Sequence, residues 1–191
     1  MGILTLTGII FGILLIILII VVAYLRVSNE GDYVNPEVNL EVTSEAFEDG
    51  GKIPINYTGR GEDVSPPLEL GSIDLEAETI AVIMDDLDHP IGMYNHWVIW
   101  NIPAEYDEIP EGVPKGEKLP SLGNAVQGKS HYGGKHYYRG PKPPFGSHEY
   151  EFKVYVLDTE LDLSPDARKE DLQKAMKGHI LRYGTLKGEF E

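Results

Sequence analysis

The feature that most constrains this chain is an uninterrupted apolar run close to its N-terminus. Residues 3–25 read ILTLTGIIFGILLIILIIVVAYL and contain no charged side chain. At about 1.5 Å of rise per residue, a helix of this length reaches across a hydrocarbon core of ~30 Å. A cleaved signal peptide fits less well, because no cation precedes the run and residues 22–24 form a poor cleavage site. The pattern predicts an uncleaved transmembrane anchor (a signal-anchor) over 1–26, and with it a single-pass membrane localisation.

The rest of the chain divides into a short tether and one domain. Residues 27–36 contain the polar stretch SNEGDYVNP, whose Gly, Asn and Pro are typical of a linker. Residues 37–191 then have the length of one ordinary domain, which buries a full hydrophobic core without metals or disulfides. Arg26 is the one cation that flanks the apolar run, so the sequence leaves open on which side of a membrane the domain lies.

Composition excludes several classes of function. The chain carries 31 Asp and Glu against 16 Lys and Arg, a formal net charge of −15 at pH 7. A protein this acidic is repelled by a phosphate backbone, so nucleic acid is not an expected partner. The chain has no cysteine, which excludes disulfides, thiolate metal sites and cysteine nucleophiles.

Alternating and β-branched segments predict a mainly β domain. Residues 38–42 alternate apolar and polar side chains, as in a half-buried strand. Residues 79–84 (TIAVIM) and 96–102 (HWVIWNI) are apolar on both faces, which is typical of central strands. The clearest strand is predicted at residues 148–156, where the even positions form an apolar face and the odd positions a polar face.

One helix is predicted near the C-terminus. Ser164-Pro165-Asp166 has the residues of a cap and first turn, and the apolar spacing that follows, through Leu172, Met176 and Ile180, is helical. On this apolar stripe His179 is expected to be a packed histidine. Strands followed by one helix predict a sandwich of two antiparallel sheets with a C-terminal helix.

A phosphate-loop pattern occurs at residues 123–130, GNAVQGKS, which matches G-x-x-x-x-G-K-S. A functional phosphate loop needs a buried strand before it and a helix after it, whose first N–H groups hold the phosphates. The sequence continues as His131-Tyr132-Gly133-Gly134, where no helix is expected to start. We therefore interpret the match as a coincidence in a glycine-rich loop.

Acids and imidazoles at the predicted strand ends have three interpretations. Asp86 and Asp88 follow one strand, His96 opens the next, and His148 starts the alternating strand. The first interpretation makes them turn residues and hydrogen-bonded core histidines. The second brings them together in a functional cleft. The third is a metal site of two histidines and a carboxylate, although no His-x-His or i,i+4 spacing arranges the ligands in advance.

Ordered sequence blocks resemble the phosphatidylethanolamine-binding proteins, the family that includes the Raf-kinase-inhibitor-like proteins of bacteria and archaea. Residues 86–90 (DLDHP) and 96–103 (HWVIWNIP) are similar to its D-P-D-A-P and H-W-V…N-I-P block. Residues 138–150 (YRGPKPPFGSHEY) look like its Y-x-G-P-x-P-P-x-G-x-H-x-Y element. Residues 63–68 (DVSPPL) and 127–128 (QG) are similar to two further elements, in family order.

The resemblance implies a Greek-key β-sandwich with a small cavity at one end, which in that family takes phosphate, acetate or a phosphorylethanolamine head group. Carried over by position, the residues implied to line or flank the cavity are Asp86, Asp88, His96, Lys142, Pro144, His148 and Tyr150. Two imidazoles can donate hydrogen bonds to a phosphate, and the carboxylates would keep them oriented.

Together these observations predict a membrane-anchored, non-enzymatic protein with a small anion-binding pocket, acting as a regulator. No cofactor and no metal is expected, and the expected partners are a small anion and the membrane, through the N-terminal helix. Two alternatives stay open. One is a hydrolase that uses the Asp/His cleft as acid and base, and the other is a protein-contact inhibitor of a kinase or protease.

Overall fold

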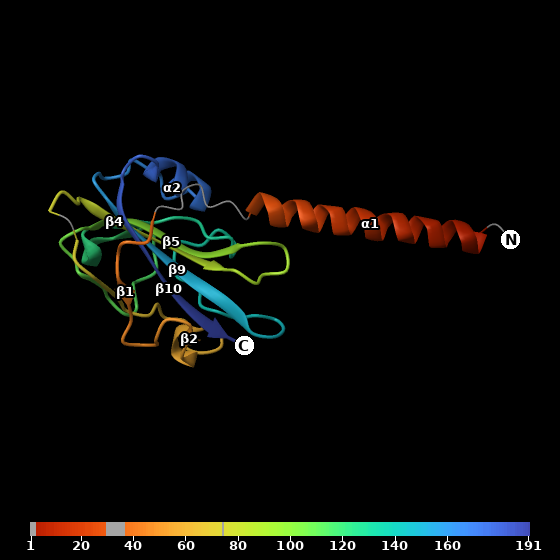
Figure 1. The fold of residues 1–191 in the computed structure, drawn as a ribbon, viewed down its shortest axis with the longest axis horizontal. Coiled ribbons are helices and arrows are strands. Elements are labelled where there is room, and N and C mark those ends of the chain that lie inside the picture. Colours follow the sequence, from red (N-terminus) through yellow and green to blue (C-terminus); the bar gives the residue numbers. More distant parts are fainter. Residues whose placement is uncertain (1–2, 30–36, 74) are drawn as a thin grey trace.

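A seven-stranded sheet forms the frame of the molecule in a computed structural model that describes residues 3–29, 37–73 and 75–191 (Figure 1). Its strands run in the order β2-β10-β9-β4-β5-β8-β7. In chain order their bounds are β2 Gly51–Lys52, β4 Thr79–Asp86, β5 Tyr94–Pro103, β7 Lys118–Leu119, β8 Ala125–Gln127, β9 His148–Leu157 and β10 Ile180–Phe190. All of its pairings are antiparallel except that of β2 with β10.

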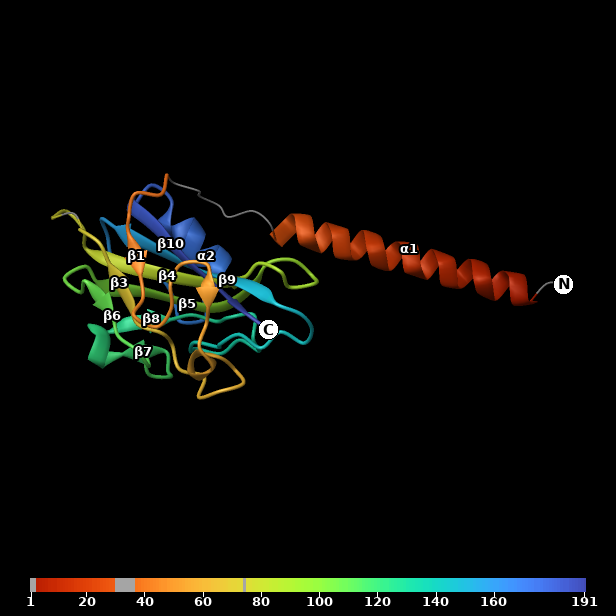
Figure 2. The ribbon, with the colours of Figure 1, turned by 60° about the horizontal axis from the view of Figure 1, so that its bottom comes forward.

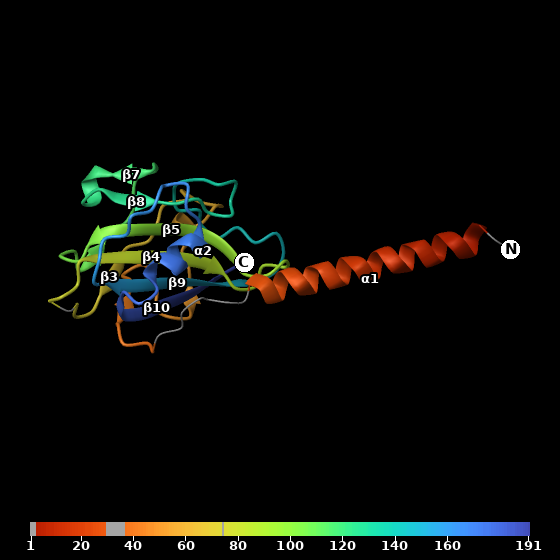
Figure 3. The same ribbon diagram turned by 90° about the horizontal axis from the view of Figure 1, so that it is seen from above.

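A three-stranded sheet and a helix cover the two faces of this frame. The small sheet, in the order β1-β3-β6, consists of β1 Val42–Thr43, β3 Leu68–Leu70 and β6 Glu108–Ile109. It packs over one face of the large sheet (Figure 2). The core between the two sheets contains Met84, Trp97 and Phe152 of the large sheet. Helix α2, Lys169–Met176, packs over the other face in a separate core (Figure 3). Short 3₁₀ turns lie at Ile55–Tyr57 and Pro120–Leu122.

The central strands are the best-predicted part of the fold. Residues 79–84 lie in β4, where every residue of the strand is buried between β9 and β5. Residues 148–156 lie in β9, and their alternation sends Phe152 into the core under the small sheet and Tyr155 into the core under α2. A sheet with both faces covered requires such apolar strands, so the mainly β prediction is confirmed.

The last strand was not predicted, because its sequence lacks a strand signature. Strand β10 contains two glycines and several charged residues, and yet it pairs with β9 along its whole length. The glycines are needed because other segments cross there. A side chain on Gly184 would meet the Leu40 carbonyl oxygen at 2.3 Å, and one on Gly188 would meet Ile53 at 2.6 Å. The chain therefore ends in a strand, and the predicted C-terminal helix precedes it.

Helix α2 is also shorter than predicted. It begins at Lys169, and the backbone N–H of its N-cap, Arg168, donates to the Asp171 carboxylate at 3.0 Å. Ser164 instead forms a separate turn, in which its hydroxyl accepts the N–H of Asp166 at 3.2 Å. Ile180 lies beyond the helix, as the first residue of β10.

The apolar N-terminal run forms helix α1, Ile3–Asn29, which stands apart from the sheets (Figure 1). Over the residues that the structure describes, no helix is both long enough and apolar enough to cross a membrane. For the described chain, the prediction of a transmembrane anchor and a single-pass membrane localisation is therefore wrong. Most of the predicted tether, 30–36, lies outside the described residues.

The phosphate-loop match at 123–130 forms no phosphate loop. Residues 125–127 form β8, at the side of the large sheet, and the backbone that follows Gly128 continues in turns and not in a helix. Lys129, which would reach the phosphates in such a loop, pairs with Asp166 at 2.5 Å. The interpretation of this motif as a coincidence is confirmed.

Candidate functional site

The ends of three neighbouring strands bring the predicted polar residues together. Asp86 is the last residue of β4, directly opposite Tyr94 at the start of β5 and Tyr150 near the start of β9. The pairing of β4 with β5 changes register at His96, which has no opposing residue, as in a β-bulge. His96 faces the same side of the sheet as Tyr94, two residues before it, and the bulge lets the next residue, Trp97, face that side as well.

A cavity of about 260 Å³ opens at this end of the sheet. Its lining comes from the ends of β4, β5 and β9 and from the loops beside them. The lining residues are Asp86, His89, Tyr94, His96, Tyr132, Lys142, Pro143, Pro144 and Tyr150. Five of the seven predicted site residues are in this set, and the other two are not.

The other two predicted residues, His148 and Asp88, hold the Asp86 carboxylate in place through hydrogen bonds. The Nδ1–H of His148 donates to the Asp86 carboxylate, with its two oxygens at 2.8 and 3.0 Å, and both side chains are buried. The Asp88 backbone N–H donates to Asp86 at 3.0 Å, while the Asp88 carboxylate accepts the Glu149 N–H at 2.8 Å. Asp88 is exposed and contributes by tying the β4–β5 turn to β9. The carboxylate of Asp86 is thus committed to partners inside the protein.

The other imidazole, His96, has a defined tautomer. Its Nδ1 lies 2.6 Å from the Arg139 carbonyl oxygen, which can only accept, so Nδ1 carries the proton. Burial lowers the pKa of His96 below its ordinary value, against the opposing effect of this hydrogen bond. The neutral ring is therefore favoured near pH 7, and its Nε2 is the nitrogen left for the cavity.

Tyr150 contributes a buried hydroxyl with unused hydrogen-bonding capacity. The side chain is 0% exposed, and its hydroxyl has no hydrogen-bond partner of good geometry among the described residues. Burial, and then the nearby Asp86 carboxylate, raise the pKa of Tyr150 well above its ordinary value. The phenol therefore stays protonated and can donate to a bound acceptor.

Of the four remaining lining residues, Pro143 adjoins the predicted Pro144, and the sequence analysis missed the other three, His89, Tyr94 and Tyr132. His89 lies between β4 and β5, where it stacks on Tyr94 with ring centroids 4.3 Å apart. Tyr94 could have been found, because alternation along a strand puts it on the same face as His96, two residues away. Tyr132 comes from a glycine-rich loop whose path no local pattern predicts. Lys142 and Pro144 lie in the lining, at exposed positions.

The metal interpretation finds no geometry in its favour. Among the described residues, no three His, Asp or Glu side chains are placed to hold one ion together. Asp86 accepts from His148 and from a backbone N–H, and His96 uses Nδ1 on a carbonyl oxygen. These contacts orient each side chain separately, and not as ligands of one common ion.

The fold and this cavity define a class of protein: a mainly β protein of two packed sheets with a small polar cavity at the strand ends. A family model described as "Phosphatidylethanolamine-binding protein" matches residues 43–191. The chain belongs to the phosphatidylethanolamine-binding protein family.

Relatives and solved structures agree with this membership. A UPF0098 protein of Pyrococcus abyssi is 45% identical over 150 residues, covering 78% of this chain and 83% of the relative. One of Methanothermobacter thermautotrophicus is 45% identical over 149 residues, covering 78% and 97%. The crystal structure of a putative phosphatidylethanolamine-binding protein homologue of Chlamydia trachomatis has a TM-score of 0.71 at 32% identity, covering 80% and 97%. That of Escherichia coli YbcL, at 23% identity and covering 80% and 98%, shares the fold with a TM-score of 0.72.

Proposed function

We propose that this chain is a regulatory, non-catalytic binding protein whose cavity takes a small phosphate-bearing anion, either inorganic phosphate or a phosphorylethanolamine head group. The observation that carries the proposal is the buried Tyr150 hydroxyl, which makes no hydrogen bond of good geometry with the described residues and lies beside a cavity that His96 and Lys142 also line. A buried hydroxyl without a partner is costly, and a phosphate oxygen would give it one. Lys142 adds a cation at the exposed mouth.

A carboxylate in an anion site needs an explanation, and the contacts of Asp86 supply one. Its oxygens accept hydrogen bonds from His148 and from the Asp88 N–H, so the carboxylate acts on the protein and not on the ligand. A nearby anion favours protonated histidine, because opposite charges attract. Protonated His96 would then donate from Nε2, so we expect binding to take up a proton and to strengthen as pH falls below neutrality.

The hydrolase alternative has weaker support. Asp86 and His148 form a carboxylate–imidazole pair, as an acid–base catalyst would, but none of the described lining residues is Ser or Thr and the sequence has no Cys. A nucleophile adjacent to a base is the usual mark of such a site. Inhibition of a kinase or protease through protein contacts stays a prediction from the resemblance.

Calorimetric titration with phosphate tests the proposal. In His148→Ala, Asp86 loses the buried partner that orients it, and we expect binding to weaken by up to about 1.5–3 kcal/mol, the usual worth of the charged hydrogen bond that is removed. Asp86→Asn should also weaken binding, although it removes a negative charge from the cavity. If Asp86 merely repelled the ligand, this substitution would strengthen binding.

The matched control is His179→Ala. His179 is likewise a histidine bonded to an aspartate, with its Nδ1 2.8 Å from Asp158, but it is exposed and lies near the opposite end of β9. We expect its affinity for phosphate to equal that of the wild type. Unchanged affinity in His148→Ala would refute the assignment of the cavity.

A further inference from the structure

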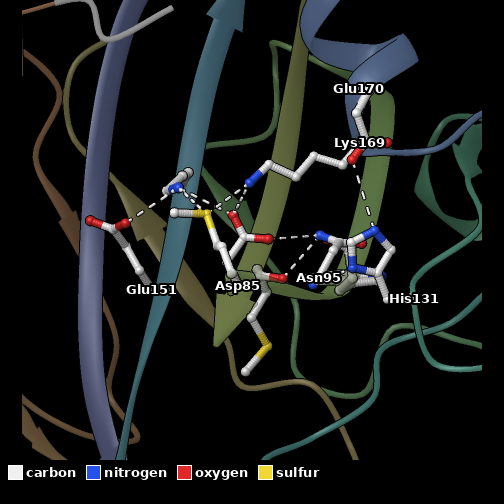
Figure 4. Close-up of polar contacts among 10 residues, drawn as sticks. Asp85, Asn95, His131, Glu151, Lys169 and Glu170 are labelled. Atoms are coloured by element: carbon white, nitrogen blue, oxygen red, sulfur yellow. Dashed lines mark hydrogen bonds and ion pairs between the residues drawn. The ribbon is translucent and has the colours of Figure 1, made fainter. Parts of the chain in front are cut away.

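A buried polar cluster lies directly behind the cavity, on the α2 face of the large sheet (Figure 4). Its centre is Asp85, which is 0% exposed. One Asp85 oxygen accepts from Lys169 of α2 at 2.6 Å and from Lys153 of β9 at 3.1 Å, and the other accepts from the Asn95 side chain at 3.1 Å. Each of Asp85 and Asn95 is next in sequence to a cavity residue, Asp86 or Tyr94, and points to the opposite face of the sheet.

His131 connects this cluster to the wall of the cavity. Its ring Nδ1 accepts the backbone N–H of Asn95 at 3.1 Å, and the backbone N–H of His131 donates to the Asn95 carbonyl oxygen at 3.1 Å. Its carbonyl oxygen accepts the hydroxyl of Tyr94 at 2.9 Å. Tyr132, the next residue, lines the cavity together with Tyr94, and the two rings meet edge to face at 5.9 Å. His131 itself is not in the lining.

These contacts fix the tautomer of His131. Because an amide N–H donates to Nδ1, this nitrogen carries no proton, and the proton of the neutral ring is on Nε2. That nitrogen faces the Glu170 carboxylate of α2, 3.8 Å away (Figure 4). Burial lowers the pKa of His131, against the opposing effect of Glu170 and Asp85. The ring therefore acts as a fixed hydrogen-bond acceptor between α2 and β5.

We propose that His131 is a positioning residue for the cavity. It holds Tyr94 through its carbonyl oxygen, Asn95 through its ring, and Tyr132 through the chain, and so sets the spacing of the aromatic wall that contacts the ligand. The identity of the ligand rests on the proposed function, whereas the placement of the two tyrosines does not. Affinity for a phosphate-bearing anion thus depends on a side chain that does not touch it.

Two substitutions at His131 separate positioning from packing. His131→Leu removes the acceptor of the Asn95 N–H while keeping an apolar side chain of similar reach. His131→Asn keeps an acceptor, because its Oδ1 can take the place of Nδ1. We expect the Leu variant to bind phosphate about tenfold more weakly, as the loss of one buried hydrogen bond allows, and the Asn variant to bind within about twofold of the wild type. His179→Leu, at the exposed histidine beyond α2, is the control and should leave affinity unchanged.

A second measurement uses the protein without ligand. In aromatic NMR spectra the ring signals of Tyr94 and Tyr132 should shift in His131→Leu and return towards their wild-type positions in His131→Asn. If the wild type bound no phosphate, the proposed function would fail, and these ring signals alone would decide the role of His131. A folded Leu variant with wild-type affinity and unmoved ring signals overturns the inference.

Should His131→Leu fail to fold, His131→Gln takes its place. Its amide is polar but carries the acceptor one methylene further out, so it should reproduce the loss of affinity and the shifted ring signals. Equal affinity and equal ring signals in the Gln and Asn variants would show that the position of the acceptor does not matter, which would also overturn the inference.

Discussion

The buried hydroxyl of Tyr150 is expected to lower the stability of the ligand-free protein and to strengthen the binding of a ligand. Tyr150 is fully buried, and its hydroxyl is one of few buried side-chain polar atoms without a hydrogen-bond partner in the described chain. A buried polar group left unpaired costs about 1–3 kcal/mol of stability. Such a cost is tolerated where function needs the group, so the residue is expected to favour the bound state over the free one.

The first prediction follows from Tyr150→Phe. Removing the unpaired hydroxyl should raise the free energy of unfolding of the ligand-free protein by about 1 kcal/mol, because a desolvation cost disappears. The same substitution should weaken phosphate binding by about 1 kcal/mol, because the ligand loses a donor. Chemical denaturation and calorimetric titration measure the two quantities.

Tyr138→Phe is the matched control for this prediction. The Tyr138 side chain is also buried, but its hydroxyl donates to the Tyr57 carbonyl oxygen at 2.6 Å and lies outside the cavity lining. We expect it to lose stability and keep its phosphate affinity, the reverse of Tyr150→Phe. Lower stability with unchanged affinity in Tyr150→Phe would mean that its hydroxyl has a structural partner and no ligand.

At the residue scale, sequence motifs predict the site only where they coincide with strand ends. The motif around His148 and Tyr150 starts a regular alternating strand, so both residues lie where the spacing predicts. His96 and its neighbour Trp97 face the same side of the sheet because of a bulge, which appears only when β4 and β5 are paired. Tyr132 is placed by contacts with β5 across a glycine-rich loop, and such long-range contacts leave no local pattern.

At the scale of elements, one glycine allows the chain just after β8 to pass close to the segment just before α2. A side chain on Gly128 would meet the Ala167 carbonyl oxygen and the Trp100 ring, each at 2.6 Å. Both belong to the core between α2 and the large sheet, and this core backs the cavity. The glycine at this place in the phosphate-loop pattern is thus required by packing.

The second prediction concerns Gly128→Ala. Overpacking of this kind costs typically about 1–3 kcal/mol, so the thermal midpoint should fall measurably. Gly12→Ala in α1 is the control, because nothing lies within 4 Å of its added Cβ, and we expect no loss of stability. An unchanged midpoint for Gly128→Ala would mean that the chain just after β8 and the segment just before α2 do not pack as closely as described.

The third prediction concerns Lys129 in the same pattern. Lys129→Ala removes a surface ion pair with Asp166, and exposed pairs contribute little to stability. The variant should therefore fold normally, and neither it nor the wild type should give heat on titration with ATP. Saturable ATP binding by the wild type that is lost in Lys129→Ala would contradict the interpretation of this loop.

The elements differ in how well the sequence predicts them, for a physical reason. Strands β4 and β9 are buried by their own apolar side chains, so their patterns suffice. Strand β10 is held by its pairing with β9 and by the segments that cross its two glycines, contacts that its own sequence does not encode. The start of α2 was predicted too early, because the local turn at Ser164 offers the same capping residues.

At the scale of the whole molecule, buried histidines make stability depend on pH. Burial lowers the pKa of His89, His96 and His131 below the ordinary value of 6.5. Below pH 6.5 the unfolded chain therefore binds more protons than the folded protein, and acid favours unfolding. Above pH 6.5 these groups are neutral in both states, and their effect vanishes.

The fourth prediction is thus a fall in the thermal midpoint between pH 7 and pH 5, measured by calorimetry at constant ionic strength. The decrease should level off once the pH is below the pKa values of the folded protein. His131→Asn, which cannot be protonated, should show a smaller decrease. A midpoint independent of pH over this range would mean that these histidines are not desolvated as described.

A crystal structure of the protein grown in phosphate tests the cavity most directly. We predict tetrahedral density in the cavity beside Asp86, with one oxygen within hydrogen-bonding distance of His96 Nε2 and another near the Tyr150 hydroxyl. Protonated His96 should then keep its Nδ1–H on the Arg139 carbonyl oxygen, as in the ligand-free protein. A cavity holding only ordered water at saturating phosphate, with the Tyr150 hydroxyl bonded to protein atoms alone, would contradict the anion-binding function.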